Sequence, residues 1–140
     1  MRQILLFAAL AASLALLSGF ALSRAKEGKA EDMTDKAAYQ KISAEEAYEM
    51  MASQEVVVVD VRTREEYDGG HIENAVLVPN ESIGSEMPDA LPDKEATLLV
   101  YCRSGRRSKD AAQKLLALGY QSVYDFGGVI DWPYELVKER

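Results

Sequence analysis

The chain has 140 residues, of which 23 are acidic and 16 basic, so its formal net charge is −7 at pH 7. This length suits one small domain around one hydrophobic core. The acidic balance makes nucleic acid and anionic membrane surfaces poor candidates as partners, and a membrane is expected only if the amino-terminal segment is retained. The sequence contains a single cysteine, Cys102, and a single histidine, His71, which rule out an intrachain disulfide and a structural zinc site.

The amino-terminal residues form a separate element. Residues 4–22 carry no charge and are rich in leucine and alanine, and the basic Arg2 precedes them. Small residues around Ala21 and Ser23 offer cleavage sites, so we predict a signal peptide over residues 1–25. An uncleaved membrane anchor formed by residues 4–22 is the alternative, because about 20 apolar residues span a bilayer. We therefore expect an exported, periplasmic protein, or one that is anchored to the membrane.

A polar linker over residues 26–38 is expected to lead into a single domain over residues 39–140. The domain opens with a capping box, Ser43 to Glu46, which predicts a helix through about Ala52. The continuous apolar run from Val56 to Val59 then predicts a strand that is covered on both faces.

A second capping box, Thr63 to Glu66, predicts a short helix that ends at Gly69 and Gly70. Apolar runs and helical spacing predict the later elements: strands over Val76–Val78, Leu98–Tyr101 and Ser122–Tyr124, a helix over Ser108–Leu118, and a final helix capped by Asp131 and Pro133. Alternating strands and helices indicate an α/β fold with a mostly parallel sheet.

Cys102 is expected at the carboxyl end of a strand, where open α/β sheets place their sites. The thiol of free cysteine has a pKa of about 8.5, and nearby arginines favour its ionisation; Arg103, Arg106 and Arg107 follow within the same turn. The start of the next helix adds a partial positive charge and free backbone N–H groups. The turn therefore predicts a reactive thiolate, whereas the alternative is a buried cysteine beside solvated arginines.

The number of residues between the cysteine and the last arginine of this turn indicates which kind of reaction the thiol performs. Four residues separate Cys102 from Arg107, and a cysteine phosphatase loop is one residue longer. The tighter cradle suits a transferable sulfur atom better than a tetrahedral phosphate. The stretch from Cys102 to Ser108 closely resembles the active loop of the rhodanese family of single-domain sulfurtransferases.

The resemblance extends over roughly Ile42 to Val137. Asp60–Tyr67, followed by Gly70–Ala75, resembles the upstream family signature, and Gly127–Trp132 resembles the downstream one. The chain departs from the family at Glu73 and Asn74, where we expect only a changed surface turn. The resemblance implies a three-layer α/β/α architecture with a central, mostly parallel sheet of about five strands.

The resemblance also implies a thiosulfate sulfurtransferase. The Cys102 thiolate would attack the outer sulfur of a small anionic donor such as thiosulfate, release sulfite and carry a persulfide to cyanide or a thiol. We expect no metal or organic cofactor and a monomeric protein. The candidate site residues are the catalytic Cys102; Arg103, Ser104, Gly105, Arg106, Arg107 and Ser108 for binding the donor; and Asp60 and Arg62 in support. The Asp60 carboxylate is expected to orient loop arginines or, alternatively, to form a local salt bridge or turn.

Other residues receive structural interpretations. His71 is expected to be structural, because a thiolate that is already ionised needs no general base. Trp132 and the pair Gly127–Gly128 are expected to shape a pocket wall and a tight turn. Two alternative functions stay open: a sulfur carrier or binding module without catalysis, and a phosphatase or arsenate reductase, which the loop length disfavours.

Overall fold

The computed structural model describes residues 38–138, so the predicted signal peptide and nearly all of the predicted linker lie outside the described residues. In chain order the elements are β1 (Gln40–Lys41), α1 (Ala44–Ser53), β2 (Val57–Asp60), α2 (Arg64–Asp68), β3 (Val76–Leu77), the 3-10 turn η1 (Asn80–Ser82), β4 (Thr97–Cys102), α3 (Arg106–Ala117), β5 (Ser122–Gly128) and the 3-10 turn η2 (Val129–Asp131).

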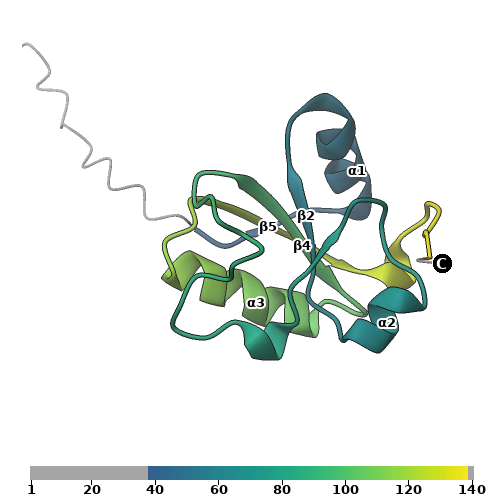
Figure 1. Ribbon diagram of the computed structural model, residues 1–140. Coiled ribbons are helices and arrows are strands. Elements are labelled where there is room, and N and C mark those ends of the chain that lie inside the picture. Colours follow the sequence, from purple (N-terminus) through teal and green to yellow (C-terminus); the bar gives the residue numbers. More distant parts are fainter. Residues whose placement is uncertain (1–37, 139–140) are drawn as a thin grey trace, which may run out of the picture. The chain divides into compact units, whose positions relative to one another are not determined.

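The strands form one five-stranded sheet in the order β1-β5-β4-β2-β3. Every neighbouring pair is parallel, which confirms the predicted α/β fold. Helices α1 and α3 lie on opposite faces of the sheet (Figure 1). Strand β1 was not predicted, because two exposed residues carry no periodic pattern; Gln40 and Lys41 pair with β5.

The core forms two clusters, one on each face of the sheet, and strand β4 contributes side chains to both. Its side chains alternate between the two faces of the sheet, as the pleat requires. Leu98, Val100 and Cys102 pack in the cluster that contains α3 residues, whereas Leu99 and Tyr101 pack in the cluster that contains the α1 residue Ala47. All of these side chains are essentially buried. Cys102 therefore lies on the α3 side of the sheet.

The capping boxes at the starts of α1 and α2 are present as predicted, with reciprocal bonds between Ser43 and Glu46 and between Thr63 and Glu66. Helix α3 begins two residues before its predicted start at Ser108. Its N-cap is Gly105, with a φ of 102°, a left-handed conformation that glycine adopts without penalty. This places Arg106 and Arg107 in the first turn of the helix.

The predicted final helix after Asp131 is wrong. Trp132 has a ψ of 111°, because the following Pro133 disfavours helical backbone in the residue before it. From Trp132 to Lys138 the chain forms no helix, and Val137 pairs with His71 through hydrogen bonds in both directions. Between residues 38 and 138, no helix is sufficiently long and apolar to cross a membrane.

Candidate active site

Cys102 is the last residue of β4, and its neighbours enclose its sulfur. The residue is only 1 % exposed. The Gly105 N–H donates a hydrogen bond to Sγ at 3.0 Å. Because Gly105 is also the N-cap of α3, the loop turns the free N–H groups of that helix towards the sulfur. The structure thus places the thiol in a cradle of backbone donors that suits a negatively charged sulfur.

These donors control the ionisation of the thiol. Burial alone would raise the pKa of Cys102. Hydrogen bonds from the N–H and the hydroxyl of Ser108, and from the N–H groups of Gly105 and Ser104, outweigh burial and lower that pKa. A lowered pKa increases the fraction of thiolate, which is the nucleophilic form of cysteine.

The guanidinium of Arg107 is held by a carboxylate from outside the loop. Its two terminal nitrogens donate to the two carboxylate oxygens of Glu66, each at 2.8 Å. Glu66 lies on α2, and its Oε2 also accepts the Thr63 N–H at 3.1 Å. The same carboxylate therefore caps α2 and clamps the arginine of the loop. The sequence identified Glu66 only as a helix cap, because nothing in the local pattern shows that α2 faces the start of α3.

Replacing Glu66 by glutamine is expected to reduce stability by about 1–2 kcal/mol at neutral pH, because a charged bidentate bond is lost. The hydrogen bonds from Arg107 lower the pKa of Glu66 from 4.5 to about 2. A depressed carboxyl pKa contributes stability above the unfolded pKa, and this contribution disappears as pH falls through the folded pKa. Thermal melts of both proteins should therefore converge between about pH 5 and pH 2. A difference in melting temperature that is constant over this range would contradict the prediction.

The remaining loop arginines face solvent. Arg103 and Arg106 are exposed, as is Ser104, whereas Ser108 is buried. The structure brings all the predicted loop residues together around one strand-to-helix turn. Their roles in binding a sulfur donor remain predictions, and the two exposed guanidiniums are the ones that are free of Glu66.

Asp60 and Arg62 form a separate buried cluster beside the loop. The Arg62 guanidinium donates to the Asp60 carboxylate, with the shortest contact at 2.6 Å, and to the carbonyl of Gly70 at 2.8 Å. The Tyr101 hydroxyl donates to Asp60 Oδ2 at 2.6 Å. Of the two roles expected for Asp60, the structure shows the local salt bridge, and the described residues provide no hydrogen bond from Asp60 to a loop arginine. Glu66 instead orients the loop arginine Arg107.

Asp125 is a buried carboxylate that the sequence analysis did not single out. It accepts hydrogen bonds from the Ser108 hydroxyl at 2.7 Å, the Gly127 N–H at 2.9 Å and the Tyr39 hydroxyl at 2.6 Å. The Lys41 ammonium lies 3.4 Å away. Asp125 thus ties α3, the Gly127 turn and the segment around β1 together behind the Cys102 loop. The sequence did contain one indication of this role, because Asp125 directly follows the predicted strand Ser122–Tyr124.

The glycine pair at the end of β5 lies against the active loop. Gly127 has a φ of 90°, which supports the predicted tight turn. Gly128 is the register partner of Cys102 across a shift in the β4–β5 pairing. A Cβ at Gly128 would lie 2.5 Å from the Ser104 nitrogen and closer still to the Arg103 carbonyl. Glycine is therefore required here by the close approach of two backbones.

His71 behaves as a structural residue in the described part of the chain. Its ring stacks on Tyr67 with centroids 3.6 Å apart, and its Nδ1 lies 2.8 Å from the Tyr67 carbonyl oxygen. It is buried at 4 % exposure. Between residues 38 and 138, no three His, Cys, Asp or Glu side chains gather into a group that could hold a metal ion.

Fold and site together define a class of protein: a parallel α/β domain with a single ionisable thiol in a strand-to-helix loop of backbone donors. The model of the rhodanese-like domain family matches residues 43–133, and the chain belongs to this family.

Solved structures agree with this assignment. A rhodanese with anions from E. coli is 34 % identical, with a TM-score of 0.55 over 61 % of this chain and 100 % of that chain. A rhodanese-like domain protein from Staphylococcus aureus is 32 % identical, with a TM-score of 0.62 over 72 % of this chain and 99 % of that one. A human single-domain sulfurtransferase is 28 % identical, with a TM-score of 0.59 over 66 % and 93 % of the two chains.

Curated proteins whose names describe a different activity are also similar to this chain in sequence. A tRNA uridine(34) hydroxylase from Hamiltonella defensa subsp. Acyrthosiphon pisum (strain 5AT) is 35 % identical over 98 residues, which cover 66 % of this chain and 28 % of that protein. The enzyme of the same name from Yersinia pestis (strain Pestoides F) is 32 % identical over 96 residues, or 65 % and 27 % of the two chains. The chain thus spans little more than a quarter of the length of these relatives.

Proposed function

We propose that the protein transfers sulfane sulfur from a small anionic donor such as thiosulfate to a thiophilic acceptor, through a persulfide on Cys102. The observation that carries this proposal is the cradle around Sγ, where the Gly105 N–H donates at 3.0 Å at the start of α3. Donors fixed around one sulfur atom stabilise a thiolate and, after transfer, the anionic outer sulfur of a persulfide.

The reaction balances without a cofactor. In the first half, the Cys102 thiolate attacks the outer sulfur of thiosulfate, a new S–S bond forms, and sulfite leaves with the electron pair of the old bond. In the second half, cyanide or a thiolate attacks the outer persulfide sulfur, and Cys102 leaves as the thiolate. The lowered pKa of Cys102 favours both halves, because the thiolate is the attacking group in one and the leaving group in the other.

The decisive test is mass spectrometry of the purified protein after treatment with thiosulfate. We expect a gain of one sulfur atom, its removal by cyanide, and no gain in a Cys102→Ala variant. Circular dichroism of the variant serves as the folding control. If the native protein gains no sulfur while it remains folded and its thiol reduced, the proposal is overturned.

The names of the curated relatives favour a second candidate, hydroxylation of a tRNA uridine. Two observations weigh against it: the chain spans about a quarter of those proteins, and its net charge of −7 opposes binding to a polyanion. A filter-binding titration with tRNA at low salt distinguishes the two candidates. Saturable binding of tRNA would favour the second.

We also propose that the protein works outside the cytoplasm as a monomer. The apolar, uncharged residues 4–22 support export or anchoring. Cell fractionation with amino-terminal sequencing of the mature chain tests this proposal. Recovery of an intact amino terminus in the soluble cytoplasmic fraction would contradict it.

A further inference from the structure

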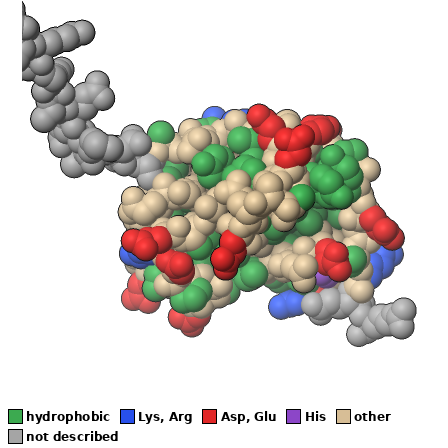
Figure 2. All heavy atoms as spheres, turned by 90° about the horizontal axis from the view of Figure 1, so that it is seen from above, with side chains coloured by type: hydrophobic (Ala, Val, Ile, Leu, Met, Phe, Trp, Pro, Cys, Tyr) green, Lys and Arg blue, Asp and Glu red, His purple; other side chains and the backbone are tan. Residues whose placement is uncertain are grey.

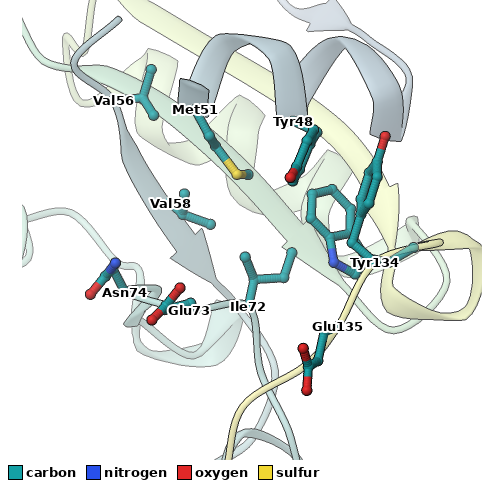
Figure 3. Close-up of a pocket in the computed structure, with 10 residues that line it drawn as sticks. Tyr48, Met51, Val56, Val58, Ile72, Glu73, Asn74, Tyr134 and Glu135 are labelled. Atoms are coloured by element: carbon teal, nitrogen blue, oxygen red, sulfur yellow. The ribbon is translucent and has the colours of Figure 1, made fainter. Parts of the chain in front are cut away.

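A cavity lies on the α1 side of the sheet, opposite the face that holds Cys102. Its volume is about 430 Å³, within the range of small-molecule sites. Its walls come from α1, the region of β2, the turn after His71 and the segment after η2 (Figure 3). None of the loop residues 102–108 lines it. The lining residues Val58, Ile72 and Trp132 belong to the core cluster opposite the one that holds Cys102.

Three aromatic rings form one wall of this cavity. Tyr48 stacks on Tyr134 with centroids 3.9 Å apart, and Trp132 meets Tyr134 edge-on at 5.0 Å. Tyr48 is nevertheless 46 % exposed, so part of this wall is open to solvent. The face of an aromatic ring carries partial negative charge and attracts a cation placed over it.

Acidic groups complete the rim. Glu73 and Glu135 line the cavity together with Asn74, and no lysine, arginine or histidine is among its lining residues. Within residues 38–138, neither carboxylate lies within salt-bridge distance of a basic side chain. Seen from the α1 side, acidic side chains are spread over the surface and basic ones lie at its margins (Figure 2). The cavity therefore combines π faces with unpaired negative charge.

Trp132 provides independent evidence that this cavity lacks a hydrogen-bond acceptor. It is 9 % exposed, and its Nε1 is the buried side-chain nitrogen or oxygen that lacks a hydrogen-bond partner in the described residues. Buried indole N–H groups usually find an acceptor, so an unpartnered one beside a cavity indicates a missing polar group. Met51 and Ile72, which Figure 3 shows among the labelled side chains, add apolar surface for a hydrocarbon body.

We propose that this cavity binds a small organic ammonium ion. The cationic head lies against the aromatic wall, Glu73 and Glu135 on the rim attract it electrostatically without touching it, and its alkyl part contacts Met51 and Ile72. A hydroxyl or carbonyl oxygen of the ligand accepts the Trp132 N–H. The rings, the carboxylates and the absence of lining cations select against anions and neutral isosteres alike. This inference does not depend on the sulfur chemistry of Cys102.

The chain offers a direct probe, because Trp132 is its single tryptophan. The full chain is titrated with choline and, in parallel, with 3,3-dimethyl-1-butanol, in which a neutral carbon replaces the ammonium nitrogen. We expect choline to change the Trp132 fluorescence saturably, with a dissociation constant about tenfold lower than that of the alcohol. Ring currents should also shift the N-methyl proton resonances of choline upfield, a measurement that does not depend on the tryptophan signal.

Variants locate the binding. The double variant Glu73→Gln, Glu135→Gln should weaken choline binding at least about fivefold and abolish its salt dependence, because these carboxylates supply the screened attraction. Glu86→Gln, an exposed carboxylate outside the cavity, is the matched control and should bind as the native protein does. Equal affinity for choline and the alcohol, no saturable signal, or unchanged binding in the double variant would each overturn the proposal. Sulfur loading of Cys102 in the double variant should remain unchanged.

Discussion

A Gly128→Ala variant is expected to lose at least about 100-fold in the rate of sulfur loading from thiosulfate, because displacing a reacting group by about 1 Å has effects of that size. Gly128 has extended backbone angles, so alanine is conformationally acceptable at this position. The obstacle is steric: an added Cβ would collide with the Arg103 carbonyl and the Ser104 nitrogen. Both are backbone atoms of the active loop, so the loop itself must move.

A displaced loop would no longer direct its backbone N–H groups at the sulfur of Cys102. The Ile130 N–H donates to the Arg103 carbonyl at 3.2 Å, and Ser104 and Gly105 supply N–H groups to Sγ. We therefore expect the thiol pKa of the variant to rise, as measured by the pH dependence of iodoacetamide alkylation. Gly84→Ala is the matched control, since a Cβ there meets nothing within 4 Å. Native rates in Gly128→Ala would show that the loop tolerates the displacement.

An Asp125→Ala variant is expected to lose about 3 kcal/mol or more of stability, because each buried polar group left without its partner costs about 1–3 kcal/mol. The Tyr39 hydroxyl and the Gly127 N–H lose their acceptor, whereas the Ser108 hydroxyl keeps the carbonyls of Gly105 and Gly127 within reach. For a domain of this size, the loss corresponds to a fall in melting temperature of about 10 °C or more. Urea denaturation measures the loss, and Tyr39→Phe, which removes a single bond to Asp125, should show a much smaller one.

The milder Asp125→Asn variant separates stability from thiol chemistry. The Ser108 hydroxyl has one proton, and its shortest contact is with Asp125 Oδ1 at 2.7 Å. Replacing the Asp125 carboxylate by a neutral amide removes a negative charge from behind the Cys102 loop, and a nearby negative charge disfavours the thiolate. We therefore expect lower stability together with a lower thiol pKa, as read from alkylation rates against pH. A thiol pKa that rises in this variant would show that Asp125 acts only by holding the loop in place.

Local chemistry allowed most of the elements to be predicted. Capping boxes placed the starts of α1 and α2 correctly, since a cap depends only on residues three apart. The buried strands β2 and β4 were predicted within about two residues, because continuous apolar runs are typical of covered strands. Strand β1 and the segment after η2 were missed or mistaken, because pairing with β5 and with His71 determines them and their own sequences do not.

Three features of the loop could be predicted from the residues alone: one thiol, its spacing to Arg107, and its place at the end of a strand. The groups that surround this thiol loop could not be predicted, because folding brings them together. Glu66 holds Arg107, Asp125 holds Ser108, Gly128 sets the clearance of the loop, and Asp60 is taken up by Arg62 and Tyr101. The physical reason is range. Caps, buried strands and the Asp60–Arg62 ion pair follow from neighbours along the chain. The contacts of Arg107 with Glu66, of Ser108 with Asp125 and of Tyr101 with Asp60 join residues 17 to 41 positions apart. They exist only once the parallel sheet has brought its strand ends together.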